Sequence, residues 1–128
     1  MIHLDTHVVV WLYAGRVDLF PSRVRGVMEE DELAISPIVL LELQYLNEIR
    51  RIDADAATIV VSLERTIGLH TATAPFEDVV REACGSSWTR DPFDRLIVAQ
   101  AGLEAARLLT KDASIRRHYK AAVWAGRR

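Results

Sequence analysis

Four carboxylates lie at positions where an acid is costly unless it has a partner. They are Asp5, Glu42, Asp94 and Asp112. The first and last follow short apolar runs typical of strands, the second interrupts a leucine-rich helix, and the third falls in the first turn of another helix. Burying an unpaired carboxylate costs several kcal/mol or raises its pKa until it is neutral. Because one shared divalent cation would stabilise all four, we expect a metal-dependent hydrolase site.

Each acid also has a simpler structural explanation. Asp5 and Asp112 could cap the helices that follow them, and Asp94 would stabilise a helix dipole. Glu42 lies beyond the reach of the helix N-terminal N–H groups, so capping does not explain it, although it could occupy an exposed slot. Asp91 precedes Pro92, a pairing that favours an N-cap over a metal ligand. The joint placement of the acids is what favours a site.

The kinds of side chain present limit the metal. The sequence has no paired cysteines, no Cys/His spacing typical of zinc and no glycine-rich phosphate loop. Ligands that are all oxygen atoms favour Mg²⁺ or Mn²⁺ over zinc or copper. We therefore expect Mg²⁺ or Mn²⁺ as the cofactor.

Composition restricts the partners and the location. The chain has 128 residues, of which 50% are hydrophobic and 27% charged, which is typical of one compact domain spanning 1–128. A net charge of −2 argues against nonspecific binding of long duplexes, so nucleic-acid contacts must be local. The single cysteine, the lack of a signal-like N-terminus and the absence of a membrane-length apolar run predict a cytoplasmic protein.

Short strands alternate with helices along the chain. We expect strands at residues 2–4, 33–35, 69–71, 108–110 and 121–124. We expect helices at residues 8–13, 21–28, 37–51, 54–66, 76–84, 92–105 and 113–119. This alternation predicts an α/β fold with a short, mostly parallel sheet and helices on both faces. Ligands bind outside the carboxyl ends of such strands, where Asp5 and Asp112 fall.

Four segments carry a family resemblance, in order and across nearly the whole chain. They are residues 2–7 (IHLDTH), 36–43 (SPIVLLEL), 90–101 (RDPFDRLIVAQA) and 108–112 (LLTKD). With these segments the chain resembles PIN-domain ribonucleases, and within that group the VapC-type toxins of type II toxin–antitoxin systems. The resemblance implies a PIN-like fold and hydrolysis of RNA phosphodiester bonds at a site made of Asp5, Glu42, Asp94 and Asp112. Either Asp91 or Asp94 could be the third acid, and we prefer Asp94.

The resemblance also implies partners and accessory residues. It implies a homodimer and a cognate antitoxin that binds an apolar groove. Thr6 or Ser36 could add a ligand or position a water molecule. Side chains near the acids that could contact RNA are Arg95, Lys111, Arg116 and Trp88, the last by stacking on an unpaired base.

Other classes of protein remain as alternatives. A receiver-like phosphoacceptor domain also has an Asp at a strand end and a lysine nearby, here Lys111, but it needs an acidic pair at the first strand. A haloacid dehalogenase-type phosphatase needs an Asp two residues after Asp5, where His7 stands. A catalytically silent interaction module would differ from a nuclease in showing no stabilisation by Mn²⁺.

Overall fold

The architecture is a parallel sheet with helices around it. The computed structural model describes residues 1–125. Within this range the strands are β1 (Ile2–Leu4), β2 (Leu33–Ile35), β3 (His70–Thr71), β4 (Arg107–Leu109) and β5 (Ala122–Val123). The helices are α1 (Thr6–Tyr13), α2 (Ser22–Met28), α3 (Pro37–Glu48), α4 (Ala56–Ile67), α5 (Phe76–Ala83), α6 (Pro92–Leu103) and α7 (Ala113–His118), with a 3₁₀ turn η1 (Val17–Leu19). The predicted α/β class is confirmed.

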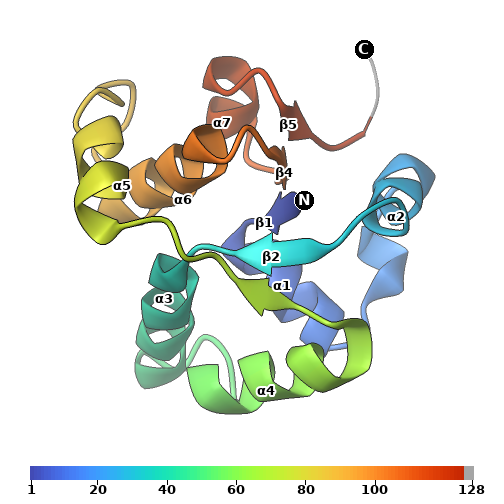
Figure 1. The fold of residues 1–128 in the computed structure, drawn as a ribbon. Helices are drawn as coiled ribbons and strands as arrows, with labels where there is room; N and C mark the ends of the chain where they lie inside the picture. Colours follow the sequence, from blue (N-terminus) through green and yellow to red (C-terminus); the bar gives the residue numbers. More distant parts are fainter. Residues whose placement is uncertain (126–128) are drawn as a thin grey trace.

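The strands lie in the order β3-β2-β1-β4-β5, and every neighbouring pair is parallel. In Figure 1, α3 and α4 lie on one side of the sheet, and α5 and α6 lie on the other. Helix α1 packs against α3 and α4, and α5 packs against α6. Both faces are therefore covered by helices, as expected for a parallel sheet.

Capping residues set several helix starts. Ser36 accepts a hydrogen bond from the backbone N–H of Ile38 at the start of α3, where Pro37 occupies the first helical position. Asp55 caps α4, and Gly68 ends that helix in the left-handed conformation with φ of 68°. These local signals explain why most predicted bounds lie within a few residues of the observed ones.

The end of α3 differs from the prediction. The helix ends at Glu48 rather than at residue 51, and Arg50 follows with a positive φ of 64°. The Asn47 side chain donates hydrogen bonds to the carbonyls of Ile52 and Asp53 and so holds the chain as it turns away. The basic pair 50–51 therefore lies beyond the helix and not in its last turn.

Strand β1 occupies the centre of the sheet and is fully buried. Ile2 and Leu4 belong to the main hydrophobic cluster, which also includes Leu108 and Leu109 of β4. The residue after β1, Asp5, therefore stands in the middle of the carboxyl edge of the sheet. No helix within residues 1–125 is long and apolar enough to cross a membrane.

Candidate metal-binding active site

Asp5 is fixed between two strand ends. Its backbone N–H donates to the carbonyl of Leu109, 3.0 Å away, which continues the ladder between β1 and β4. Its carboxylate is buried and accepts hydrogen bonds from the Thr6 backbone N–H at 2.8 Å and the Thr110 hydroxyl at 2.6 Å. Asp5 thus caps α1 and is also one of the clustered carboxylates. The capping role and a role in the site, both considered from the sequence, do not exclude each other.

Glu42 approaches Asp5 from α3. Its Oε1 accepts a hydrogen bond from the Thr6 hydroxyl at 2.5 Å. Burial raises the pKa of Glu42, and the negative charges of Asp5 and Asp91 raise it further, while the Thr6 hydrogen bond opposes them. Thr6 therefore contacts two of the four acids, one through its backbone and one through its side chain.

The two acids of α6 have different surroundings. Asp91 is exposed, and its Oδ1 accepts the backbone N–H groups of Phe93 and Asp94 at 2.8 and 3.2 Å, so it is the predicted N-cap. Asp94 lies one turn further and is partly buried. Burial raises the pKa of Asp94 to about 7, and the negative charges of Asp91, Asp5, Asp112 and Glu42 add to this effect. Four other carboxylates thus act on Asp94.

Asp112 begins α7 and is linked to Asp5 through Thr110. Its Oδ1 accepts the backbone N–H of Ile115 at 2.9 Å, and its own N–H donates to the Thr110 hydroxyl oxygen at 3.0 Å. Thr110 is fully buried. Its single hydroxyl therefore donates to one acid and accepts from the backbone of another. We did not predict this role from the sequence, in which Thr110 is only the last residue of an apolar strand.

His7 closes the same corner of the site. The Lys111 backbone N–H donates to its Nε2 at 2.9 Å, so this nitrogen is unprotonated and the proton of the neutral ring lies on Nδ1. Nδ1 faces Asp5 Oδ2 at 3.6 Å. Burial lowers the pKa of His7 despite the nearby acids. His7 thus lies in α1 beside Asp5, whereas the His3 ring contacts Glu104.

The structure brings all the predicted acids to one cavity of about 350 Å³. Its lining comprises Asp5, Thr6, His7, Val10, Trp11, Glu42, Leu46, Ile52, Asp91, Asp94 and Asp112. Among these lining residues no lysine or arginine balances the carboxylates. Burial is the main cause of the raised pKa values of Asp94 and Glu42, and this unbalanced negative charge raises them further.

Oxygen donors with no lysine or arginine among the lining residues suit a hard divalent metal ion. Within residues 1–125 no three His, Cys, Asp or Glu side chains are close enough together to ligate one ion. Asp5, Asp91 and Asp112 each have an oxygen that accepts a backbone N–H at a helix cap, and the like charges of neighbouring carboxylates repel one another. The donor atoms are carboxylate oxygens, so their chemistry fits Mg²⁺ or Mn²⁺.

Ser36 belongs to a buried polar chain that runs away from the cavity. Its hydroxyl donates to Gln100 Oε1 at 3.0 Å, and Gln100 Nε2 donates to Glu104 Oε2 at 3.2 Å. Glu104 Oε1 lies 2.9 Å from Nε2 of His3, a ring with 1% exposure. Ser36 therefore caps the start of α3, and neither Ser36 nor His3, the two ends of this hydrogen-bonded chain, lines the acid cavity.

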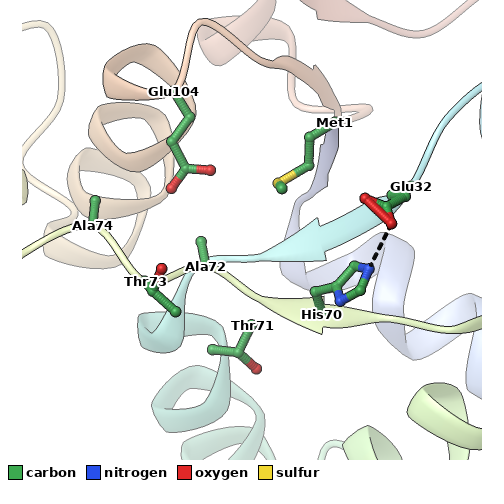
Figure 2. Close-up of a pocket in the computed structure, with 8 residues that line it drawn as sticks. All are labelled: Met1, Glu32, His70, Thr71, Ala72, Thr73, Ala74 and Glu104. Carbon is green, nitrogen blue, oxygen red and sulfur yellow. Dashed lines mark ion pairs between the residues drawn. The ribbon is translucent and has the colours of Figure 1, made fainter.

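Glu104 also borders a second hollow, of about 370 Å³, on the α6 side of the sheet. Figure 2 shows Met1, Ala72 and Glu104 around this hollow, with an ion pair between His70 and Glu32 at its edge. Met1 and Glu32 precede β1 and β2, so the hollow lies away from the carboxyl ends of these strands. Its two carboxylates have histidine partners at 2.9 and 3.4 Å, whereas among the acids that line the acid cavity Asp5 alone faces a histidine, His7, at 3.6 Å.

The predicted RNA-contacting residues have different positions. Trp88 does not line the acid cavity; its ring stacks on His118 with centroids 4.8 Å apart and planes 6° apart. Arg95 is partly buried, and its guanidinium donates to the carbonyl of Thr89 at 2.9 Å, which ties the preceding loop to α6. Arg116 is exposed on α7, and Lys111 is exposed beside the cavity.

Comparison with known proteins identifies the family and the fold. The family model for the PIN domain matches residues 2–121, and the chain belongs to that family. It is 36% identical over 118 residues to Ribonuclease VapC22 of Mycobacterium tuberculosis, a match that covers 90% of this chain and 89% of that relative.

Two solved structures share the fold. A toxin–antitoxin complex from Klebsiella pneumoniae matches with a TM-score of 0.69 and 15% identity over the whole of both chains. VapBC2 from Rickettsia felis, bound to a DNA fragment from its promoter, matches with a TM-score of 0.63 and 22% identity, covering 91% of this chain and 92% of that one. The expected PIN-like fold and the resemblance to VapC-type proteins are confirmed.

Proposed function

We propose that this protein is a Mg²⁺- or Mn²⁺-dependent endoribonuclease and the toxin of a toxin–antitoxin pair. The observation that carries the proposal is the cavity lined by Asp5, Glu42, Asp94 and Asp112, with no lysine or arginine among its lining residues. A phosphodiester nuclease needs such oxygen donors to hold a dication against an anionic substrate. The relationship to Ribonuclease VapC22 supports RNA as the substrate.

In this proposal the four acids hold the ion. When bound, it supplies Lewis acidity that activates water and stabilises negative charge on the scissile phosphate. Thr6 orients Glu42, and Thr110 orients Asp5, each through a hydroxyl that donates to the carboxylate. Asp91 acts mainly as the cap of α6 and supports the position of Asp94.

The proposed partners are a second copy of the chain and an antitoxin. An exposed apolar stripe at successive turns is formed by Leu41 and Tyr45 of α3 and by Ile49, the residue directly after the helix, with 58%, 48% and 45% exposure. This stripe supports a homodimer interface. An apolar hollow of about 410 Å³ between α1 and the start of α4 shares Val10 and Ile52 with the acid cavity. It supports an apolar antitoxin segment bound next to the acids, and VapBC complexes share this fold.

Two further parts of the proposal come from the sequence. We propose that residues 1–128 form one PIN domain and that the protein acts in the cytoplasm. RNA is present there, and a single cysteine stays reduced.

The decisive experiment is cleavage of total cellular RNA by the purified protein with Mn²⁺ or Mg²⁺, with new ends mapped by sequencing. We expect discrete ends that disappear with EDTA and with Asp94→Asn. Folded protein that yields no new ends, with no antitoxin bound and no stabilisation by Mn²⁺, would instead identify a catalytically silent interaction module.

A further inference from the structure

Part of the lining of the acid cavity has no side chain that can ligate a metal ion. Val10, Trp11, Leu46 and Ile52 form this part. We propose that Trp11 is the surface on which an unpaired base of the RNA stacks beside the scissile phosphate. This inference rests on the proposed ribonuclease function and adds a nucleobase subsite to it.

The Trp11 ring is held in place by an aromatic cluster. The centroid of His7 lies 5.0 Å from it, and those of Phe20 and Trp124 lie 6.1 and 6.0 Å away. Phe20 and Trp124 are buried, whereas Trp11 remains partly exposed at the cavity. A ring fixed in this way loses little conformational freedom when a base stacks on it, so binding is not offset by ordering the side chain.

Lys111 adds a positive charge at the same place. Its Nζ lies over the face of the Trp11 ring, 5.9 Å from the centroid, and because this side chain is flexible and exposed it can swing from the ring to a phosphate when a base stacks there. The carboxylates of the cavity repel RNA, so a cation at the rim is needed to attract the phosphate next to the stacked base. An aromatic face with an adjacent cation is the usual combination for holding single-stranded nucleic acid.

The other candidate platform is already occupied. The Trp88 ring lies parallel to His118 at 4.8 Å, so this face is covered by the protein itself. Trp11 is the tryptophan that lines the acid cavity. A cavity of about 350 Å³ suits a single nucleotide rather than a duplex, and only an unpaired base exposes a face for stacking.

The test measures binding separately from cleavage. A labelled RNA oligonucleotide that spans one mapped cleavage site is titrated against Asp94→Asn protein, which leaves the RNA intact. The same background then carries Trp11→Leu or Trp11→Phe, with Phe76→Leu as a matched control, because Phe76 is 70% exposed on α5. Each oligonucleotide is also prepared with an abasic site at one position flanking the cleaved bond.

We expect Trp11→Leu to weaken binding by about tenfold to a hundredfold, with Trp11→Phe restoring most of the affinity and Phe76→Leu without effect. At one position the abasic RNA should bind more weakly than intact RNA to protein that has Trp11. The Trp11→Leu protein should bind the abasic and the intact RNA with equal affinity. Thermal melting confirms that the variants are folded, and the abasic comparison remains decisive if packing is altered.

An equal abasic penalty with and without Trp11 would overturn the inference. If the unaltered chain shows Mn²⁺-dependent cleavage and Trp11→Leu binds RNA normally, the ribonuclease proposal is supported and the proposed Trp11 subsite is contradicted. If the unaltered chain neither cleaves RNA nor binds it, both proposals fail.

Discussion

The Thr110 hydroxyl donates a hydrogen bond to Asp5 Oδ2 at 2.6 Å and so joins two residues that are 105 positions apart in the chain. The same oxygen accepts the backbone N–H of Asp112 at 3.0 Å. One buried hydroxyl thus sets the relative position of two carboxylates that follow the neighbouring strands β1 and β4. Its replacement should affect the site more than the fold.

We expect Thr110→Val to reduce RNA cleavage at least about tenfold and the free energy of unfolding by about 1–3 kcal/mol, because two buried groups lose their partner. Thr110→Ser, which keeps the hydroxyl, should retain most of the activity. Cleavage rates and urea unfolding of both variants provide the measurement. Equal activity of Thr110→Val and the unaltered chain would show that Thr110 does not orient Asp5.

The two acids of α6 can be separated by amide substitutions. Asn is as good an N-cap as Asp, so Asp91→Asn should preserve α6 and most of the stabilisation by Mn²⁺. Asp94→Asn should abolish that stabilisation, because it removes a proposed ligand. Thermal shift at increasing Mn²⁺ concentration measures both. The reverse outcome, with Asp91→Asn losing the shift, would make Asp91 the third acid.

The pKa of Asp94 predicts a pH-dependent stability. The side chain holds its proton up to about pH 7 in the folded protein, whereas an unfolded Asp loses it near pH 4. Between these values the folded state binds more protons, so stability decreases as pH rises through this window. Without metal, the melting temperature should therefore fall from about pH 5 to about pH 8, and Asp94→Asn should flatten the curve.

Because Mn²⁺ competes with this proton, Mn²⁺ affinity and cleavage should both rise with pH through about 7. Calorimetric titration and initial rates across this range measure the two effects. A pH–rate profile that is flat between mildly acidic and neutral pH would contradict competition between metal and proton.

The chain from Ser36 through Gln100 to Glu104 predicts energetic coupling. Gln100→Leu leaves the partners of its amide unsatisfied and should cost about 1–3 kcal/mol. Ser36→Ala should cost about 1 kcal/mol through the lost cap of α3. The double variant should lose less than the sum, by about 0.5 kcal/mol or more. Additive losses in chemical denaturation would show that the two residues act independently.

The exposed stripe of α3 predicts the assembly state. Tyr45→Glu puts a charge in the proposed interface and should convert a dimer into a monomer, as measured by light scattering after gel filtration. Val61→Glu is the matched control, since Val61 is 44% exposed on α4 outside the stripe. A monomeric unaltered chain, or a dimer that survives Tyr45→Glu, would remove this interface.

The acids could be predicted from the sequence because each interrupts a local pattern. Glu42 stands among leucines, and Asp5 directly follows a strand. The energetic cost of burying each carboxylate and its place in the fold can therefore be inferred from a few neighbouring residues. The parallel sheet then brings strand ends together, a general property of the architecture. The meeting of these carboxylates at one cavity follows from local pattern and topology alone.

The supporting residues could not be predicted in this way, because their partners are distant in the sequence. Thr110 depends on Asp5, and Gln100 contacts Ser36, which is 64 positions away. Trp88 lies in a Gly-Ser loop that looks free in the sequence, yet α7 supplies His118 to cover its ring. Trp11 sits in an apolar run, and only the fold places it beside the acids.

The central position of β1 has a consequence for synthesis of the protein. Asp5 leaves the ribosome about a hundred residues before its hydrogen-bond partner Thr110 and its neighbouring strand β4. A nascent chain that ends before residue 110 lacks both Thr110 and Asp112, so it cannot form the complete carboxylate cavity. The capacity for cleavage would thus arise only after Asp112 has been synthesised, and products truncated before it would not cleave RNA.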